Sequence, residues 1–276
     1  MARRTAQVNR KLVRRNGEAG RRGFTLIELL AVLAVVFILL LGASVTFRKA
    51  REMALATACR SNLHQWAGAF HAYAADHQGR FPHTDDWTRA DKSGLSVEES
   101  PHNHCWVDVL PPYMGMKAWR DHPEGERPTR NPWQCPAAVY AEDKDYRYPR
   151  SRTGSFTYAM NSYLSYDFDY GGLHGGESYL NTLRCTAPAQ TILLFEQAAA
   201  PTDGLYPQYS NREAGRYPGE DVTALTCRHR RVSGEEGSNF LFIDGHVAWR
   251  NDIWVRQHSD FPSENDDLEW FPYPYK

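Results

Sequence analysis

The stretch FTLIELLAVLAVVFILLLGASVTF at residues 24–47 decides the architecture of the chain. Its only charged side chain is Glu28, and a helix of 24 residues is about 36 Å long at 1.5 Å per residue. That length exceeds the hydrocarbon thickness of a bilayer, which is roughly 30 Å. The stretch therefore predicts a single membrane-spanning helix.

A basic segment precedes this helix. Residues 1–23 contain eight of the 32 Lys and Arg side chains and one acid, Glu18, so the rest of the chain has 24 basic and 32 acidic residues. A basic arm can bind nucleic acid, but positive charge directly before an apolar span usually marks its cytoplasmic end. We therefore expect no nucleic-acid partner, a cytoplasmic N-terminus in the inner membrane, and a head that is periplasmic or extracellular.

Two other export signals fit part of the same stretch. Residues 29–41, followed by the small residues 42–44, have the pattern of a secretory signal peptide and its cleavage site. The Arg-Arg pair at residues 21–22, close to an aromatic residue, is typical of a twin-arginine signal. Neither signal accounts for Glu28, because a charge within hydrocarbon costs about 2.5–3.5 kcal/mol on insertion scales.

Cleavage after Gly23 would supply a partner for Glu28. The new α-amine of Phe24 would lie four residues, about one helical turn, from the Glu28 carboxylate. The ammonium group of the same chain or of a neighbouring subunit can then pair with this carboxylate.

The run GFTLIE at residues 23–28, between the basic segment and the apolar helix, resembles the processing site of type IV prepilins and pseudopilins. The resemblance implies that a prepilin peptidase cleaves after Gly23 and methylates the new N-terminal Phe24. It also implies that Glu28 aligns subunits during assembly into a type II secretion or type IV pilus-like filament. The implied partners are the peptidase, other pilin or pseudopilin subunits and inner-membrane lipid.

Residues 48–79 continue the helix with a different pattern. Apolar residues recur at steps of three and four, at Leu55, Cys59, Leu63, Trp66, Phe70 and Tyr73. Gly79 and Pro82 then end the helix. We therefore predict one helix of about 55 residues over residues 24–78, with an amphipathic second half that packs against a head domain.

The head, residues 80–276, contains short strand patterns. TILLFE at residues 191–196 and SFTYAMNSYLSY at residues 155–166 predict two strands. NFLFIDGHVAWR at residues 239–250 predicts an antiparallel hairpin with a two-residue turn at its Asp-Gly dipeptide.

Residues 84–103 and 117–152 are rich in Pro, Gly and charge and predict long loops. The expected fold is α+β and pilin-like, with a long helix packed on an antiparallel sheet. Its expected parts are a leader (1–23), the membrane half of the helix (24–47), the amphipathic half (48–79) and the head (80–276).

Further motifs in the head resemble pilin-like proteins that carry a C-terminal H-x9-DG motif. The matching residues are His229, Asp244 and Gly245. Fourteen residues separate His229 from Asp244 instead of nine, so RRVSGEEGS carries an insertion relative to the motif. The resemblance supplies no enzymatic activity.

A catalytic or metal site in the head is the competing hypothesis. His229, Asp244 and His246 could form an acid–base or metal cluster, and HNHC at residues 102–105 has metal-ligand residue types. Turn chemistry and loop polarity explain the same residues, and no common catalytic motif is present in the sequence. We therefore predict a protein that is not an enzyme and needs no cofactor, with Ca²⁺ as the metal to test. Candidate Ca²⁺ ligands are Asp167, Asp169 and Asp244.

The five cysteines would all lie in an oxidising compartment. Their number is odd and their spacing does not fix a connectivity, so a disulfide is expected in the head without a named pair. The aromatic tail LEWFPYPYK at residues 268–276 offers rings that stack on sugars or fill a core. The alternative function is therefore an exported, single-helix-anchored enzyme or carbohydrate-binding protein.

Overall fold

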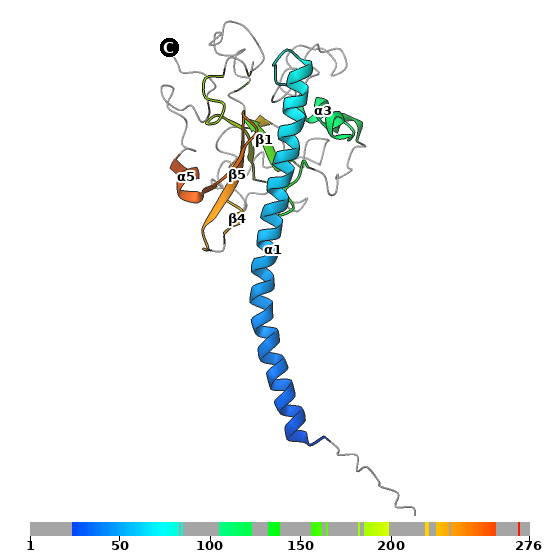
Figure 1. Ribbon diagram of the computed structural model, residues 1–276, viewed down its shortest axis with the longest axis vertical. Coiled ribbons are helices and arrows are strands. Elements are labelled where there is room, and N and C mark those ends of the chain that lie inside the picture. Colours follow the sequence, from blue (N-terminus) through cyan, green and yellow to red (C-terminus); the bar gives the residue numbers. More distant parts are fainter. Residues whose placement is uncertain are drawn as a thin grey trace, which may run out of the picture. The chain divides into compact units, whose positions relative to one another are not determined.

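The computed structural model (Figure 1) describes a subset of the chain. The described residues are 24–82, 84, 105–122, 132–138, 156–161, 164, 182, 185–198, 219–220, 225–231, 233–257 and 270. The chain divides into two units, Met1–Phe47 and Arg48–Lys276. The basic leader, Gly23, Asp167 and Asp169 lie outside the described residues.

The long helix α1 extends over Leu26–Asp76, 51 residues, so the predicted helix exists and is two residues shorter at each end. At its C-terminus Gln78 adopts a left-handed φ of 58° and the N–H of Gly79 donates to the carbonyl of Ala74 at 2.7 Å. This is a Schellman cap, which satisfies a terminal carbonyl and stops the helix before Pro82.

The first unit contains the apolar part of α1. Phe24 and the leucine, isoleucine and valine side chains that follow it are solvent-exposed in the chain, for example Phe24 at 79% and Leu41 at 57%. Among the described residues, α1 is the one helix long and apolar enough to cross a membrane. Such a surface is stable only against lipid or against other apolar helices.

The second unit begins with the amphipathic part of α1, whose predicted apolar face is buried. Cys59, Leu63, Trp66 and Phe70 have no exposed surface. The ring of Trp66 packs edge-on against Trp106 with ring centroids 4.8 Å apart, and its Nε1 donates to the carbonyl of Pro132 at 2.7 Å. The buried indole thus has both its apolar and its polar requirements met.

The described residues of the head form a six-stranded sheet with the order β3-β1-β2-β5-β4, and β6 pairs with the other edge of β5. All pairs are antiparallel except β1 with β3, a parallel pair that the sequence did not predict. The strands are β1 (Tyr158–Asn161), β2 (Ile192–Glu196), β3 (Gly219–Glu220), β4 (His229–Arg230), β5 (Glu236–Phe242) and β6 (Val247–Asn251). Short helices α3 (Trp106–Val109), η1 (Pro111–Met114), η2 (Trp119–Asp121) and α5 (Asp252–Gln257) complete the described elements. The predicted α+β architecture, a long helix with an antiparallel sheet, is confirmed.

Alternating residues of the strands cover the two faces of this sheet, as the strand period of two requires. Leu241 belongs to the core that includes the apolar face of α1, whereas Phe240 and Phe242 belong to a second core with Val255 of α5. Trp270 is also buried in this second core, with its ring 5.7 Å from that of Phe195. This ring of the aromatic tail is therefore a core residue and not an exposed sugar-stacking platform.

The β5–β6 hairpin exists where it was predicted, but its turn is of another type. The N–H of Gly245 donates to the carbonyl of Phe242, and the N–H of Phe242 donates to the carbonyl of His246. Gly245 has a φ of 90°, whereas Asp244 is not among the residues with positive φ. A two-residue type I′ turn needs positive φ at both central positions, so the Asp-Gly pair instead ends a longer turn with the glycine in the left-handed position.

Gly245 also lies against α1. We expect Gly245→Ala to destabilise the head by about 1–3 kcal/mol, because a side chain at positive φ is strained. A Cβ at this position would lie 2.8 Å from Nε2 of His71. The double variant with His71→Ala should recover only the part of the lost stability that comes from the clash with His71. The backbone strain at positive φ remains. Denaturant unfolding of the full chain in detergent measures both effects.

The matched control is Gly68→Ala on the exposed side of α1, where an added Cβ meets nothing within 4 Å. This change should stabilise the helix by up to about 1 kcal/mol. A Gly245→Ala variant as stable as the parent would show that the turn does not dock on α1 as described.

Candidate functional site

The N-terminus of α1 is capped by three reciprocal hydrogen bonds between Thr25 and Glu28. The Glu28 carboxylate Oε2 accepts from the backbone N–H of Thr25 at 2.9 Å and from its hydroxyl at 2.8 Å. The backbone N–H of Glu28 donates to Thr25 Oγ1 at 3.3 Å. This is a capping box, and its Thr-x-x-Glu signature is present in the sequence.

The capping box holds the Glu28 carboxylate on Thr25, which directly follows Phe24, the residue that becomes the N-terminus if the chain is cut after Gly23. In the described part of the chain both bonds to this carboxylate use Oε2. The other oxygen, Oε1, is therefore available to a second donor, and the positive end of the helix dipole favours the negative charge at this place.

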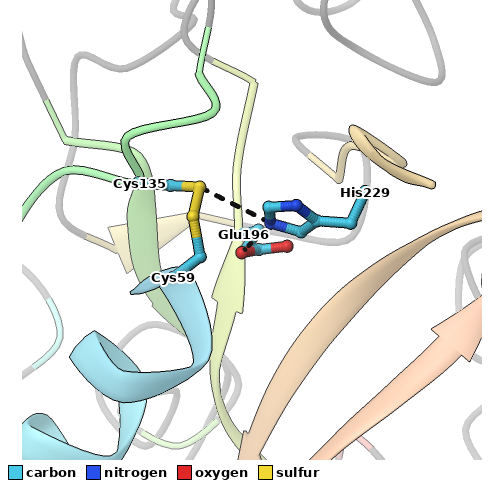
Figure 2. A group of neighbouring side chains, drawn as sticks. All are labelled: Cys59, Cys135, Glu196 and His229. Atoms are coloured by element: carbon cyan, nitrogen blue, oxygen red, sulfur yellow. Dashed lines mark hydrogen bonds and ion pairs between the residues drawn. A yellow bond between two sulfur atoms is a disulfide. The ribbon is translucent and has the colours of Figure 1, made fainter. Parts of the chain in front are cut away.

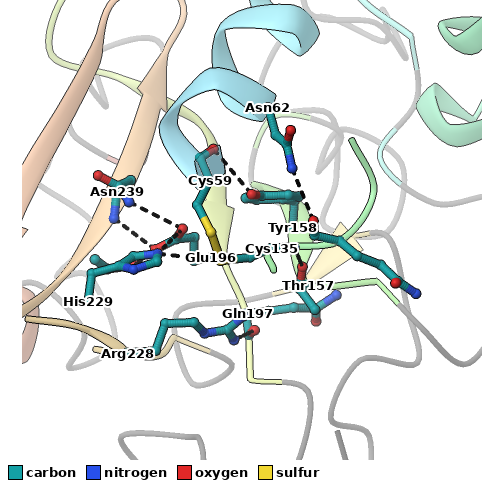
Figure 3. A network of polar contacts seen from close by, with 12 residues as sticks. Cys59, Asn62, Cys135, Thr157, Tyr158, Glu196, Gln197, Arg228, His229 and Asn239 are labelled. Carbon is teal, nitrogen blue, oxygen red and sulfur yellow. Dashed lines mark hydrogen bonds and ion pairs between the residues drawn. A yellow bond between two sulfur atoms is a disulfide. The ribbon is translucent and has the colours of Figure 1, made fainter. Parts of the chain in front are cut away.

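A second constellation lies inside the head and centres on Glu196, the last residue of β2 (Figure 3). Its carboxylate is fully buried. Oε1 accepts from His229 Nε2 at 2.7 Å and from Asn239 Nδ2 at 3.3 Å. Oε2 accepts from the hydroxyl of Ser238 at 3.0 Å and from the backbone N–H of Asn239 at 2.9 Å. Four donors thus replace the water that a buried carboxylate loses.

Opposing effects set the charge state of Glu196. Burial raises the pKa of its carboxyl, but the charge and the hydrogen bond of His229 act in the opposite direction. The nearby Arg228 guanidinium and the Asn239 N–H lower it further, so the pKa of Glu196 lies below its usual value. The carboxylate is therefore ionised at neutral pH.

His229 also contacts a disulfide (Figure 2). Cys59 of α1 and Cys135 are joined by a disulfide with Cα atoms 4.9 Å apart, and Cys135 Sγ lies 3.5 Å from His229 Nε2. Next to the disulfide, Asn62 Nδ2 donates to the carbonyl of Gln134 at 3.0 Å. The 132–138 segment is thus tied to α1 by a covalent bond and by hydrogen bonds.

An open pocket of about 300 Å³ gives access to His229 from the surface. Its rim is charged, with an exposed ion pair between Arg230 and Glu236. The pocket is lined by Glu52, Leu55, Ala137, Arg228, His229, Arg230 and Glu236.

The structure does not bring together His229, Asp244 and His246, the cluster that the competing catalytic hypothesis requires. His229 is buried opposite Gly237 near the start of β5, and Asp244 follows the end of that strand, about 20 Å further along at 3.3 Å per residue. Asp244 instead contacts the exposed His246. Its Oδ1 accepts from His246 Nδ1 at 2.6 Å and from the His246 backbone N–H at 3.0 Å. His229 and the Asp-Gly turn therefore lie at opposite ends of β5. Of HNHC, only Cys105 is described, and it is buried.

Two of the half-buried thiols, Cys185 and Cys227, are poor nucleophiles. Burial raises the pKa of the Cys185 thiol, and burial followed by the charge of Asp252 raises the pKa of Cys227 to about 12. A thiol with a raised pKa carries little thiolate at neutral pH. Neither cysteine therefore has the environment of a catalytic thiolate.

Comparison with known proteins finds a family match in the N-terminal segment that contains Thr25 and Glu28. Residues 19–44 match the family model described as the prokaryotic N-terminal methylation motif. This match covers Gly23 and Phe24, the capping box and the start of the apolar helix, and it supports a type IV pilin-like protein that is a substrate of prepilin peptidase. No curated protein and no solved structure is significantly similar to the chain.

The disulfide gives a direct prediction for the five cysteines. Peptide mapping without reduction should find Cys59 linked to Cys135 and should find Cys105, Cys185 and Cys227 as thiols. Because the bond closes a loop over a sequence separation of 76, its reduction should destabilise the head by about 2–4 kcal/mol. A different linked pair in the oxidised chain would contradict this connectivity.

Proposed function

We propose that the chain is a pilin- or pseudopilin-like structural subunit of a type II secretion or type IV pilus-like filament. Prepilin peptidase removes residues 1–23, methylates Phe24 and leaves a protein that enters the filament by its N-terminal helix. The observation that carries the proposal is the match of residues 19–44 to the methylation motif, placed on an apolar helix that has no cover within the described chain.

The capping box supports a specific role for Glu28 in assembly. After cleavage the ammonium group of Phe24 lies one residue before Thr25, next to the carboxylate that Thr25 already holds through Oε2. Oε1 then accepts from this ammonium group or from that of a neighbouring subunit. The pairing removes the cost of a lone carboxylate in hydrocarbon, which is about 2.5–3.5 kcal/mol on insertion scales.

The charge distribution supports one orientation of the subunit before assembly. Eight basic residues in the leader keep the N-terminus in the cytoplasm, and a single pass of α1 places the head outside the inner membrane. The disulfide between Cys59 of α1 and Cys135 fits this compartment. The function is assembly and presentation of the head, with no catalytic step.

We expect Glu28→Gln to reduce filament assembly by about 10–100-fold while cleavage after Gly23 continues, because the substitution removes the charge that pairs with the amine. The assay compares sheared filament with membrane-retained subunit in cells that contain the assembly machinery. Glu52→Gln is the matched control, since Glu52 is an exposed acid on the same helix. Equal assembly of both variants would contradict the role of Glu28, and loss of cleavage would show that Glu28 acts before assembly.

A further inference from the structure

Four side chains with metal-binding atoms meet inside the head, next to the pocket. They come from four segments of the chain, and Figure 2 shows them facing one another. Their donor atoms all lie within 4.8 Å of one another, and all four residues are buried. The residues are Cys59 of α1, Cys135 of the 132–138 segment, Glu196 of β2 and His229 of β4.

The donor set and its spacing fit a tetrahedral zinc site. Two sulfurs, one imidazole nitrogen and one carboxylate oxygen are ligand types that Zn²⁺ takes, and at its usual bond lengths the donors are about 3.3–3.8 Å apart. His229 Nε2 lies 3.5 Å from Cys135 Sγ and 2.7 Å from Glu196 Oε1. A metal therefore requires the nitrogen and oxygen to separate by about half an ångström, and the two sulfurs to separate after reduction.

The surroundings of Glu196 are those of an oriented metal ligand. Ser238 and the backbone N–H of Asn239 hold Oε2, so Oε1 is the oxygen that faces His229. Hydrogen bonds to the distal atom of a ligand fix its direction in metal sites.

The net charge of the cluster and its access from solvent also fit a zinc site. Zn²⁺ with two thiolates and one carboxylate has a net charge of −1, and the Arg228 guanidinium lies near enough to Glu196 to compensate it. His229 belongs both to the cluster and to the lining of the open pocket, which gives an ion a path from solvent.

We propose that the head binds one Zn²⁺ through Cys59, Cys135, Glu196 and His229 when the two cysteines are reduced, so that disulfide and zinc are alternative states of one cluster. Zinc binding to the two thiols releases two protons. Oxidation of the zinc-bound thiolates transfers two electrons to the disulfide of a thiol–disulfide oxidoreductase, which takes up two protons as it becomes a dithiol, and the zinc ion leaves. Either state ties α1 to the 132–138 segment, so the head keeps this connection before and after oxidation.

The test uses the full chain in detergent, reduced with a phosphine that is removed under anaerobic conditions. Zinc is titrated against a chromophoric chelator, and Co²⁺ is added separately as a spectroscopic probe. We expect one Zn²⁺ per reduced chain and none per oxidised chain. The Co²⁺ complex should show the sulfur-to-metal charge-transfer band of two thiolates and the visible bands of a tetrahedral site.

Cys135→Ser should weaken zinc binding by at least about 100-fold, above the roughly 10–100-fold effect of losing an outer hydrogen-bond partner. The matched control is Cys185→Ser, which removes a thiol outside the cluster and should bind zinc like the parent. Both the reduced parent and reduced Cys135→Ser lack the disulfide, so the comparison isolates the ligand.

Three results would overturn the proposal: no zinc on the reduced parent, equal affinity of the parent and Cys135→Ser, or loss of binding in Cys185→Ser. If Cys135→Ser does not fold, as judged by near-ultraviolet circular dichroism, the Co²⁺ spectrum of the parent decides. A spectrum with no charge-transfer band or with octahedral features excludes this cluster as the site.

Discussion

Substitution of Gly23 by valine is expected to abolish cleavage of the leader, so that the protein accumulates at full length in the membrane fraction. Gly23 is the residue directly before the proposed cut, and the family match of residues 19–44 includes it. A β-branched side chain at this position changes both the volume and the backbone freedom of the residue at the scissile bond. Immunoblots of cells that contain prepilin peptidase measure the ratio of precursor to mature chain.

The matched control is the same substitution at Gly42, where an added Cβ meets nothing within 4 Å. Gly42 lies beside the position at which signal peptidase would cut, so the two variants distinguish the two export pathways. Processing that fails in Gly42→Val and continues in Gly23→Val would contradict the pilin pathway and favour a secretory signal peptide.

The second large effect is expected from Glu196→Gln, which should destabilise the head by about 3–5 kcal/mol, the usual cost of removing one partner of a buried ion pair. The amide retains an acceptor for Ser238 or His229 but places an NH₂ group against the donors on its other side. For a unit of this size the loss corresponds to a fall in Tm of roughly 6–20 °C. Thermal unfolding of the full chain in detergent, followed by tryptophan fluorescence, measures it.

Glu236→Gln provides the comparison, because Glu236 pairs with Arg230 at the surface and both side chains are about half exposed. Exposed pairs contribute little to stability, so this variant should unfold close to the parent. A Glu196→Gln chain that unfolds at the same temperature as Glu236→Gln would show that the Glu196–His229 pair does not hold β2, β4 and β5 together.

Local patterns made the helix and the sheet predictable. The apolar run and the spacing of Cys59, Leu63 and Trp66 determine one long helix with one buried face, since helical periodicity is a property of neighbouring residues. The β5–β6 hairpin was predictable for the same reason. Its turn type was not, because the docking of Gly245 against His71 depends on a contact between residues far apart in sequence.

The buried cluster around Glu196 could not be predicted from patterns of neighbouring residues. Cys59 and Cys135 are 76 residues apart, and Glu196 meets His229 only because β2 and β4 both lie beside β5. One signal was present: an acid at the end of the otherwise apolar strand TILLFE must find donors if the strand is buried. The Thr25–Glu28 capping box, by contrast, is a local motif and was fully readable in the sequence.

The measurement that tests the central claim most directly is the mature N-terminus, determined by mass spectrometry of the membrane fraction from cells that contain prepilin peptidase. The account predicts a chain that begins at Phe24 and carries a methyl group on its α-amine. A chain that begins near Ser44, or an intact Met1, would contradict it and would assign residues 24–47 to a signal peptide or to an uncleaved anchor.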